Sequence, residues 1–119
     1  MVVYKLLLGK AEIELRLYRR GRSRPFSDWL ASLKDARAAA IVRSRLNRLR
    51  LGNFGDCKSV GGGVEELRID FGPGYRVCFG RDGLVVVILL SGGDKKSQAR
   101  DILAAQQGWK ECLDAKSEG

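Results

Sequence analysis

The stretch that decides the fold is VEELRIDFGPGYRVCFGRDGLVVVILL, residues 64–90. Apolar and polar side chains alternate on both sides of Gly72-Pro73-Gly74, and this period of two residues predicts half-buried strands over 64–71 and 75–81. Asp82-Gly83 then predicts a tight hairpin turn. The run 84–90 is apolar at every position, so a third strand, 84–91, should be central and covered on both faces.

The chain on either side of this stretch completes the predicted fold. Residues 11–18 and 57–60 have the composition of strands, and a turn at Gly61-Gly62-Gly63 connects the second of them to residue 64. Apolar residues spaced three and four apart predict two antiparallel helices, one beginning at Pro25 and one covering 36–51. Asp94 can cap a last helix that runs to about residue 113.

The predicted fold class is therefore α+β. We expect an antiparallel sheet of four to five strands with a mixed edge, packed with two N-terminal helices and one C-terminal helix. Residues 1–119 form one predicted domain, with an N-terminal extension at 1–10 and a frayed polar tail at 114–119.

The alternation also assigns side chains to faces. The residues expected to face the core from the first strand and the last helix are Ile13, Leu15, Leu17, Ile102, Leu103 and Trp109. If residues 72–74 form a three-residue loop, Asp70 lies opposite Arg76, and Arg68 opposite Cys78. Both arginines and Glu66 then share one open face of the sheet. The alternative is a surface ion pair between Asp70 and Arg76 that contributes little to stability.

The absence of histidine excludes several kinds of chemistry. With no histidine among 119 residues, the chain has no imidazole general base, no Ser-His-Asp relay and no histidine-containing zinc site. The cysteines, at positions 57, 78 and 112, are too far apart for a C-x-x-C motif and indicate reduced cytosolic thiols. We therefore predict neither a metal nor a cofactor.

The sequence indicates a cytoplasmic protein that does not bind membranes. No export signal is recognisable at the N-terminus, because Lys5 interrupts its short apolar run. The longest uncharged stretch, 83–93, is about half as long as a membrane-spanning helix.

Positive charge is concentrated in the N-terminal half. The formal net charge is +8, and residues 1–51 alone carry +9. Such a surface can dock phosphate backbones without reading their sequence, or it can be a solvated helix face. The residues expected to bind RNA or the ribosome are Arg37, Arg43, Arg45, Arg48 and Arg50.

A second basic feature lies in Ser91-Gly92-Gly93-Asp94-Lys95-Lys96. Two lysines in the first turn of a helix oppose the helix dipole. Backbone N–H groups, the dipole and both ammonium groups would then converge at a Gly-rich turn, and this combination predicts an anion site.

Several segments together resemble a known family. These are Phe26-x-x-Trp29-Leu30-x-x-Leu33-Lys34-Asp35, the segment from Arg45 to Phe79 with Phe71-Gly72-Pro73-Gly74-Tyr75-Arg76 at its centre, and Gly92-Gly93-Asp94-Lys95-x-x-Gln98. Over about residues 11–110 the chain closely resembles the RelE/HigB superfamily of toxins, specifically the phage-related HigB-like addiction module killer group.

The resemblance implies a compact RelE/ParE-like domain and the toxin of a type II toxin–antitoxin module. Many such toxins cleave messenger RNA at the ribosomal A site without a metal and are silenced by a co-encoded antitoxin, here a helix-turn-helix protein of the HigA type. Arg76 matches the family's strand arginine. The other matching basic positions are Lys58, Arg68, Lys95 and Lys96.

The chain also departs from the family pattern. Members often carry a tyrosine late in the chain, whereas the last tyrosine here is Tyr75, and Cys78 replaces a second strand tyrosine. The proton-transfer role is therefore unassigned and falls either to a lysine with a lowered pKa or to the ribosome. Two alternative functions stay open: a noncatalytic ParE-like inhibitor of DNA gyrase, and an inactive basic RNA-binding domain.

Overall fold

The computed structural model describes residues 12–118, so the predicted extension at 1–10 and Gly119 lie outside the described residues. The elements are β1 (Glu14–Leu17), α2 (Pro25–Ser32), α3 (Ala36–Arg50), β2 (Cys57–Gly61), β3 (Val64–Ile69), β4 (Tyr75–Asp82), β5 (Val86–Asp94) and α4 (Gln98–Glu118). The strands form one sheet in the order β1-β5-β4-β3-β2. Only β1, at the edge, runs parallel to its neighbour. The α+β class and the mixed edge are confirmed.

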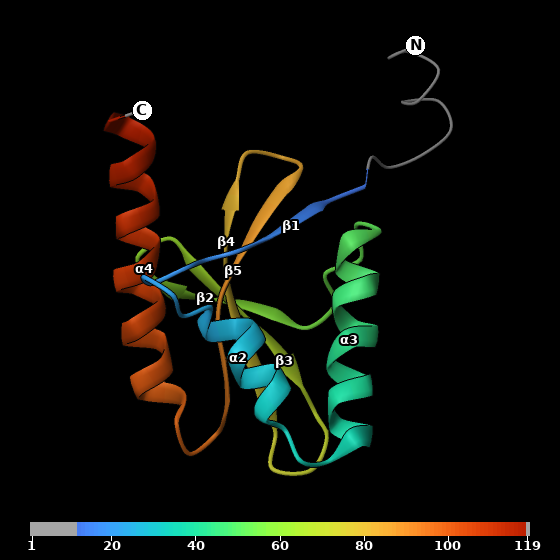
Figure 1. Ribbon diagram of the computed structural model, residues 1–119. Helices are drawn as coiled ribbons and strands as arrows, with labels where there is room; N and C mark the ends of the chain where they lie inside the picture. Colours follow the sequence, from blue (N-terminus) through green and yellow to red (C-terminus); the bar gives the residue numbers. More distant parts are fainter. Residues whose placement is uncertain (1–11, 119) are drawn as a thin grey trace, which may run out of the picture.

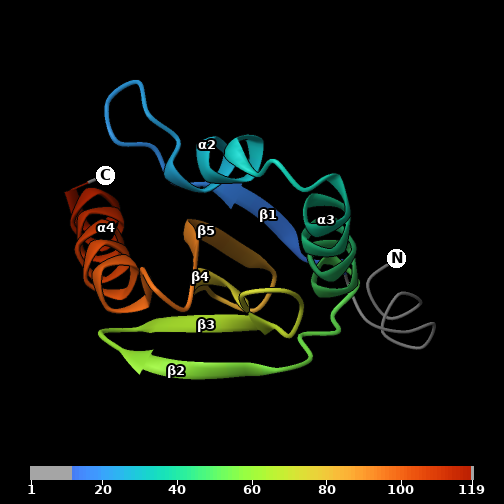
Figure 2. The same ribbon diagram turned by 90° about the horizontal axis from the view of Figure 1, so that it is seen from below.

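Helices cover both faces of the sheet (Figures 1 and 2). On one face, α2 and α3 enclose a core that includes Leu49, Leu67 and Phe79. On the other face, α4 closes a smaller core around Leu90 and Trp109. Because successive strand residues point to opposite faces, β5 contributes to both cores, and its predicted central position is confirmed.

A glycine lets α4 approach the sheet closely. A Cβ at Gly80 of β4 would lie 2.3 Å from Cε3 of Trp109, a distance that no real contact allows. The indole ring therefore lies directly against the β4 backbone, and α4 is held against the sheet at this point.

The predicted boundaries of β5 and α4 are wrong at both ends. Leu84 is 93% exposed in the turn before β5, and the strand continues through Gly92 and Gly93 to Asp94. The Asp94 carboxylate accepts hydrogen bonds from the N–H groups of Lys96 and Ser97. This local turn delays the helix to Gln98.

The tail at 114–118 is helical rather than frayed. An ion pair between Lys116 and Asp82 of β4 links the last turns of α4 to the sheet. A polar composition correctly indicates exposure here, but it does not distinguish a solvated helix from an irregular tail.

The register between β3 and β4 also differs from the prediction. β3 ends at Ile69, and the connection is the five-residue loop 70–74 rather than a three-residue loop. Arg68 therefore lies opposite Arg76, and Glu66 lies opposite Cys78. The two arginines share a face as expected, but this face is not open, because Glu66 and Cys78 on it are buried under α4.

Two of the predicted core residues are exposed. Leu17 is 39% exposed and Leu103 is 68% exposed, because β1 lies at the sheet edge and Leu103 lies on the outer side of α4. Ile13 and Trp109 are buried as predicted, and Leu15 and Ile102 pack against the two cores.

Candidate functional site

Three of the predicted catalytic residues meet in one cleft. Arg68 lies at the end of β3, Arg76 near the start of β4, and Lys95 directly after β5; together they line a cavity of about 260 Å³. We call this cavity the Arg76 cleft. The remaining lining residues are Asp56, Ile69, Asp70, Gly72, Pro73, Gly74 and Tyr75.

Strand pairing explains why these cations converge. The register places Arg68 opposite Arg76, and it places Asp94, the residue before Lys95, opposite Tyr75. The loop passes under the lysine at Gly74, whose φ of +79° is typical of glycine and where a Cβ would lie 3.6 Å from Cγ of Lys95.

A buried carboxylate holds the two arginines from below. Glu66 is 1% exposed, and its Oε1 lies 3.1 Å from Nη1 of Arg76 and 3.4 Å from Nε of Arg68. Gln98 of α4 donates to both carboxylate oxygens at 3.0 and 3.2 Å. The Arg76 side chain is 14% exposed and is held beside the cleft through Nη1, while its Nε is buried without a hydrogen-bonding partner in residues 12–118.

The polar pattern of the β3 sequence does not reveal this role for Glu66. Alternation places it on the same face as Arg68, as observed, but it predicts solvent there. The contact with Gln98 joins residues 32 positions apart. The burial of Glu66 is therefore visible only when the position of α4 on the sheet is known.

The charges of the cleft are balanced. Its three cations face the carboxylates of Asp56 and Asp70 at the rim, with Glu66 beneath. Such a mixed cleft can bind a phosphodiester through the cations while a carboxylate or the Tyr75 phenol takes part in proton transfer. Tyr75, to which the sequence assigns no role, lines the cleft from β4, is 9% exposed, and belongs to the core under α2 and α3.

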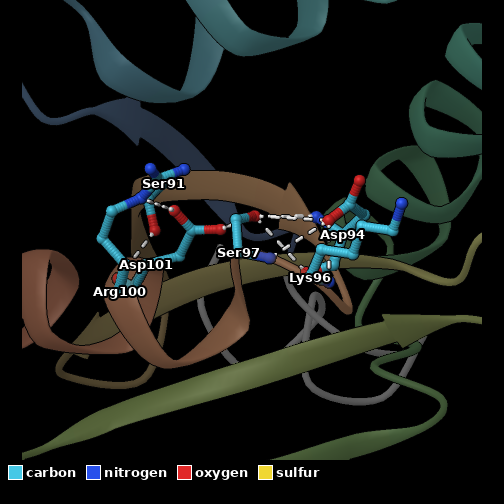
Figure 3. A network of polar contacts seen from close by, with 6 residues as sticks. All are labelled: Ser91, Asp94, Lys96, Ser97, Arg100 and Asp101. Carbon is cyan, nitrogen blue, oxygen red and sulfur yellow. Dashed lines mark hydrogen bonds and ion pairs between the residues drawn. The ribbon is translucent and has the colours of Figure 1, made fainter.

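Two of the predicted catalytic lysines lie outside the cleft. Lys58 is exposed on β2, opposite Glu66 in the register. Lys96 lines a neighbouring hollow of about 560 Å³, and Figure 3 shows its side chain extending away from Ser97 and Asp101. The predicted anion-binding turn is wrong in its backbone donors, since Asp94 accepts the N–H groups of Lys96 and Ser97.

The five arginines of α3 do not form one free surface. Arg45 is a structural residue, because its guanidinium donates to the backbone oxygens of Arg68 at 2.7 Å and Phe54 at 3.4 Å. Arg50 pairs with Glu12 at 3.1 Å, and Arg37 lies over the ring of Phe71, 5.5 Å from its centroid. The remaining two, Arg43 and Arg48, are exposed, and their side chains have no hydrogen-bonding partner within residues 12–118.

The cysteine thiols are unsuited to nucleophilic attack. Burial raises the pKa of Cys78 to about 11, and burial followed by the nearby Glu65 charge raises the pKa of Cys57 to about 11. Both thiols are therefore protonated at neutral pH. All three cysteines are free.

Across residues 12–118, no group of three or more Cys, Asp or Glu side chains is arranged to hold a metal ion. None of the helices in this range is long and apolar enough to cross a membrane.

Comparison with known proteins identifies a relative of the chain. No family model matches the chain. Over 81 residues the chain is 53% identical to an uncharacterized protein of Haemophilus influenzae strain Rd, and this match covers 68% of the chain and 82% of the relative. The chain belongs to the same family as this Haemophilus influenzae protein.

Proposed function

We propose that this protein is a RelE/HigB-type toxin that inhibits translation in the cytoplasm as a ribosome-dependent mRNA endonuclease. The observation that carries the proposal is the convergence of Arg68, Arg76 and Lys95 on one cleft. The strand arginine that the family resemblance marks as functional is thus joined there by two further cations from separate elements.

The reaction needs no nucleophile from the protein. The 2′-OH of RNA attacks the adjacent phosphorus, a 2′,3′-cyclic phosphate forms, and the bond from phosphorus to the 5′-oxygen breaks. The cations of the Arg76 cleft would stabilise the additional negative charge on the phosphorane. Because Glu66 and Gln98 fix Arg76 before substrate binds, little reorganisation is needed during the reaction.

Two proton transfers complete the reaction, and the cleft offers groups for both. A carboxylate at its rim, Asp56 or Asp70, can accept the proton of the 2′-OH. The Tyr75 phenol can donate a proton to the departing 5′-oxygen. This assignment replaces the family's late tyrosine, which the chain lacks, with a tyrosine from β4.

The proposed partners are the ribosome with its mRNA and a co-encoded antitoxin of the helix-turn-helix, HigA-like type. A net charge of +8 would steer an acidic or amphipathic chain toward the toxin. Coexpression of neighbouring small open reading frames should identify one that restores growth and copurifies with the protein.

One observation favours a noncatalytic function instead. Arg76 is mostly buried against Glu66, and the cleft has as many carboxylates as cations. A ParE-like inhibitor of DNA gyrase, or a basic RNA-binding domain, needs no phosphorane stabilisation and would tolerate a cleft in which carboxylates offset the cations.

Induced expression tests the proposal, with mRNA 5′ ends and DNA supercoiling followed in the same culture. Endonuclease activity predicts new mRNA 5′ ends at unchanged supercoiling. Lys95→Ala should lower the cleavage rate about 100-fold, whereas Lys110→Ala, an exposed lysine on α4, should not. Arg76 is tested in the double variant Arg76→Gln with Glu66→Gln, because replacing the arginine alone would leave the Glu66 charge buried without its partner. Unchanged 5′ ends with altered supercoiling would support the gyrase alternative.

A further inference from the structure

The hollow beside the Arg76 cleft has the features of a base-binding pocket. It has a volume of about 560 Å³ and lies between Trp29 of α2, the end of β5 and the beginning of α4. Its lining residues are Trp29, Gly92, Gly93, Asp94, Lys96, Ser97, Arg100 and Asp101. We call it the Trp29 hollow. We propose that it binds a single nucleobase of an RNA strand whose phosphate lies in the Arg76 cleft; this inference rests on the proposed function.

The two glycines of β5 create the hollow from both sides. A Cβ at Gly92 would lie 2.1 Å from Cε3 of Trp29, and a Cβ at Gly93 would lie 1.9 Å from Oδ2 of Asp101. The indole and the carboxylate therefore approach the strand backbone from opposite directions. Any larger residue at either position would push one of these groups away.

One side of β5 has no strand partner beside the hollow, while Ser91 and Gly93 themselves are buried. β1 pairs with β5 only from Val86 to Leu89, and the N–H of Tyr18 donates to the oxygen of Leu89. Beyond Leu89, no described strand lies on that side of β5. Peptide groups on such a strand edge can hydrogen bond a ligand that reaches them.

The side chains near the N-terminal end of α4 favour a base that donates hydrogen bonds. Asp101 is mostly buried, and its carboxylate accepts from the Ser97 hydroxyl, which lies between Asp94 and Asp101 in Figure 3. Carboxylates accept but do not donate, so they match an exocyclic amino group. Adenine, cytosine and guanine carry this group, whereas uracil does not.

Aromatic and cationic groups complete the pocket. Trp29 is half-buried and lines the hollow; in the proposed complex the base stacks on its indole, an interaction that does not depend on base identity. Lys96 and Arg100 are exposed at the rim and can contact the flanking phosphates.

The position relative to the Arg76 cleft suits one continuous strand. Tyr75 lines the cleft, Trp29 lines the hollow, and their ring centroids are 6.0 Å apart. Lys95 and Lys96, adjacent in sequence, line the cleft and the hollow respectively. A phosphate in the cleft and a base in the hollow would thus belong to the same or neighbouring nucleotides.

Binding of fluorescent hexanucleotides to the full chain tests the pocket without ribosomes. The probes are oligo(A), oligo(C) and oligo(U), measured by anisotropy. We expect Trp29→Leu to weaken oligo(A) binding about tenfold. The matched control is Phe54→Leu, since Phe54 packs against Phe79 and does not line the hollow; it should change binding less than twofold. Equal effects of the two variants, with both folded by circular dichroism, would overturn the proposal.

The preference for an amino group has its own test. The wild-type protein should bind oligo(A) and oligo(C) more tightly than oligo(U), and Asp101→Asn should reduce this preference, because an amide also donates. Asp114→Asn, an exposed residue on α4, serves as control and should leave the preference unchanged. A preference that Asp101→Asn does not alter contradicts the role of Asp101.

Cleavage assays on ribosomes separate this inference from the proposed function. If the wild-type protein cleaves mRNA and Trp29→Leu cleaves the same sites at the same rate, the base pocket is wrong and the endonuclease stands. If the wild-type protein does not cleave but Trp29→Leu still weakens oligo(A) binding, the pocket stands and the endonuclease is wrong.

Discussion

At the scale of single residues, two adjacent glutamates differ in burial and in the number of their partners. Glu65 is partly exposed and pairs with Arg81 through both carboxylate oxygens, at 2.6 and 3.0 Å. Glu66 is buried and is shared by two arginines and a glutamine. Their identical chemistry and neighbouring positions make them a natural comparison between surface and buried ion pairs.

We expect Glu66→Ala to lower the free energy of unfolding by about 3 kcal/mol or more, because Arg76 would remain buried without its counterion. Glu65→Ala should cost less than about 1 kcal/mol, since solvent screens the exposed pair. Urea unfolding of both variants gives the two values. Equal costs would contradict the structural importance of the buried carboxylate.

Tyr75 offers a test of proton transfer that leaves packing intact. Tyr75→Phe retains the ring that packs near Trp29 but removes the proposed proton donor, so single-turnover cleavage of ribosome-bound mRNA should slow about 100-fold. Tyr18→Phe, which removes a phenol bonded to Glu111 on α4, should leave the rate unchanged. A fully active Tyr75→Phe variant would assign the proton transfer elsewhere.

Cys78 should make stability depend on alkaline pH. Burial raises its pKa in the folded protein to about 11 from 9.0, so the thiol must be protonated in the folded state while the unfolded chain can ionise. The stabilisation is complete below pH 9 and is lost as the pH rises toward 11. We expect the stability of the wild type relative to Cys78→Ala to fall by about 2 kcal/mol between pH 8.5 and 11. A pH-independent difference in urea unfolding would contradict this expectation.

At the scale of elements, the position of α4 depends on small residues in β4 and β5. Its first turns cover Glu66, and its middle places Trp109 against Gly80. Because Glu66 fixes Arg76 beside the Arg76 cleft, any change that lifts α4 from the sheet should also disturb the cleft.

Gly80→Ala should therefore lower the free energy of unfolding by about 1 to 3 kcal/mol, since Trp109 must move to admit a methyl group. Gly80 is not among the glycines with positive φ, so the cost of the added methyl group comes from the contact with Trp109 and not from left-handed backbone strain. Combining Gly80→Ala with Trp109→Leu should recover part of the loss. A strictly additive double variant would show that the indole is not the obstacle.

At the scale of the whole molecule, the net charge of +8 is not uniformly available. Several basic side chains are engaged within the protein: Arg45 supports the backbone next to the Arg76 cleft, and Arg81 lies over Phe54, with its guanidinium carbon 3.8 Å from the ring centroid. The exposed Arg43 and Arg48 on α3 remain for long-range attraction to a polyanion.

The double variant Arg43→Gln with Arg48→Gln should bind ribosomes with a weaker salt dependence: the slope of log K against log salt concentration should fall by about 1.5 in magnitude, at unchanged stability. Arg45→Gln should instead destabilise the protein, because two backbone oxygens lose their donor. Cosedimentation with ribosomes at several salt concentrations measures the slope. An unchanged slope would identify the α3 surface as merely solvated.

The sequence by itself determines the class and order of the elements. The glycine turns, the alternation in 64–81 and the spacing of apolar residues in 25–51 are local signals, and the strands and helices they predict are present. The shared face of Arg68 and Arg76 is predicted as well, because paired residues lie on the same face, side chains two residues apart point the same way, and the observed register differs from the predicted one by two residues.

Only the tertiary structure decides what covers each face. The five-residue loop shifts the register by two residues, so Arg76 faces Arg68 rather than Asp70, and loop length is not set by the alternation. The burial of Glu66, the structural use of Arg45 and the Trp29 hollow all depend on where helices pack on the sheet. Periodicity distinguishes the two faces of a strand, but only packing determines which polar residue exchanges solvent for a partner from a distant element.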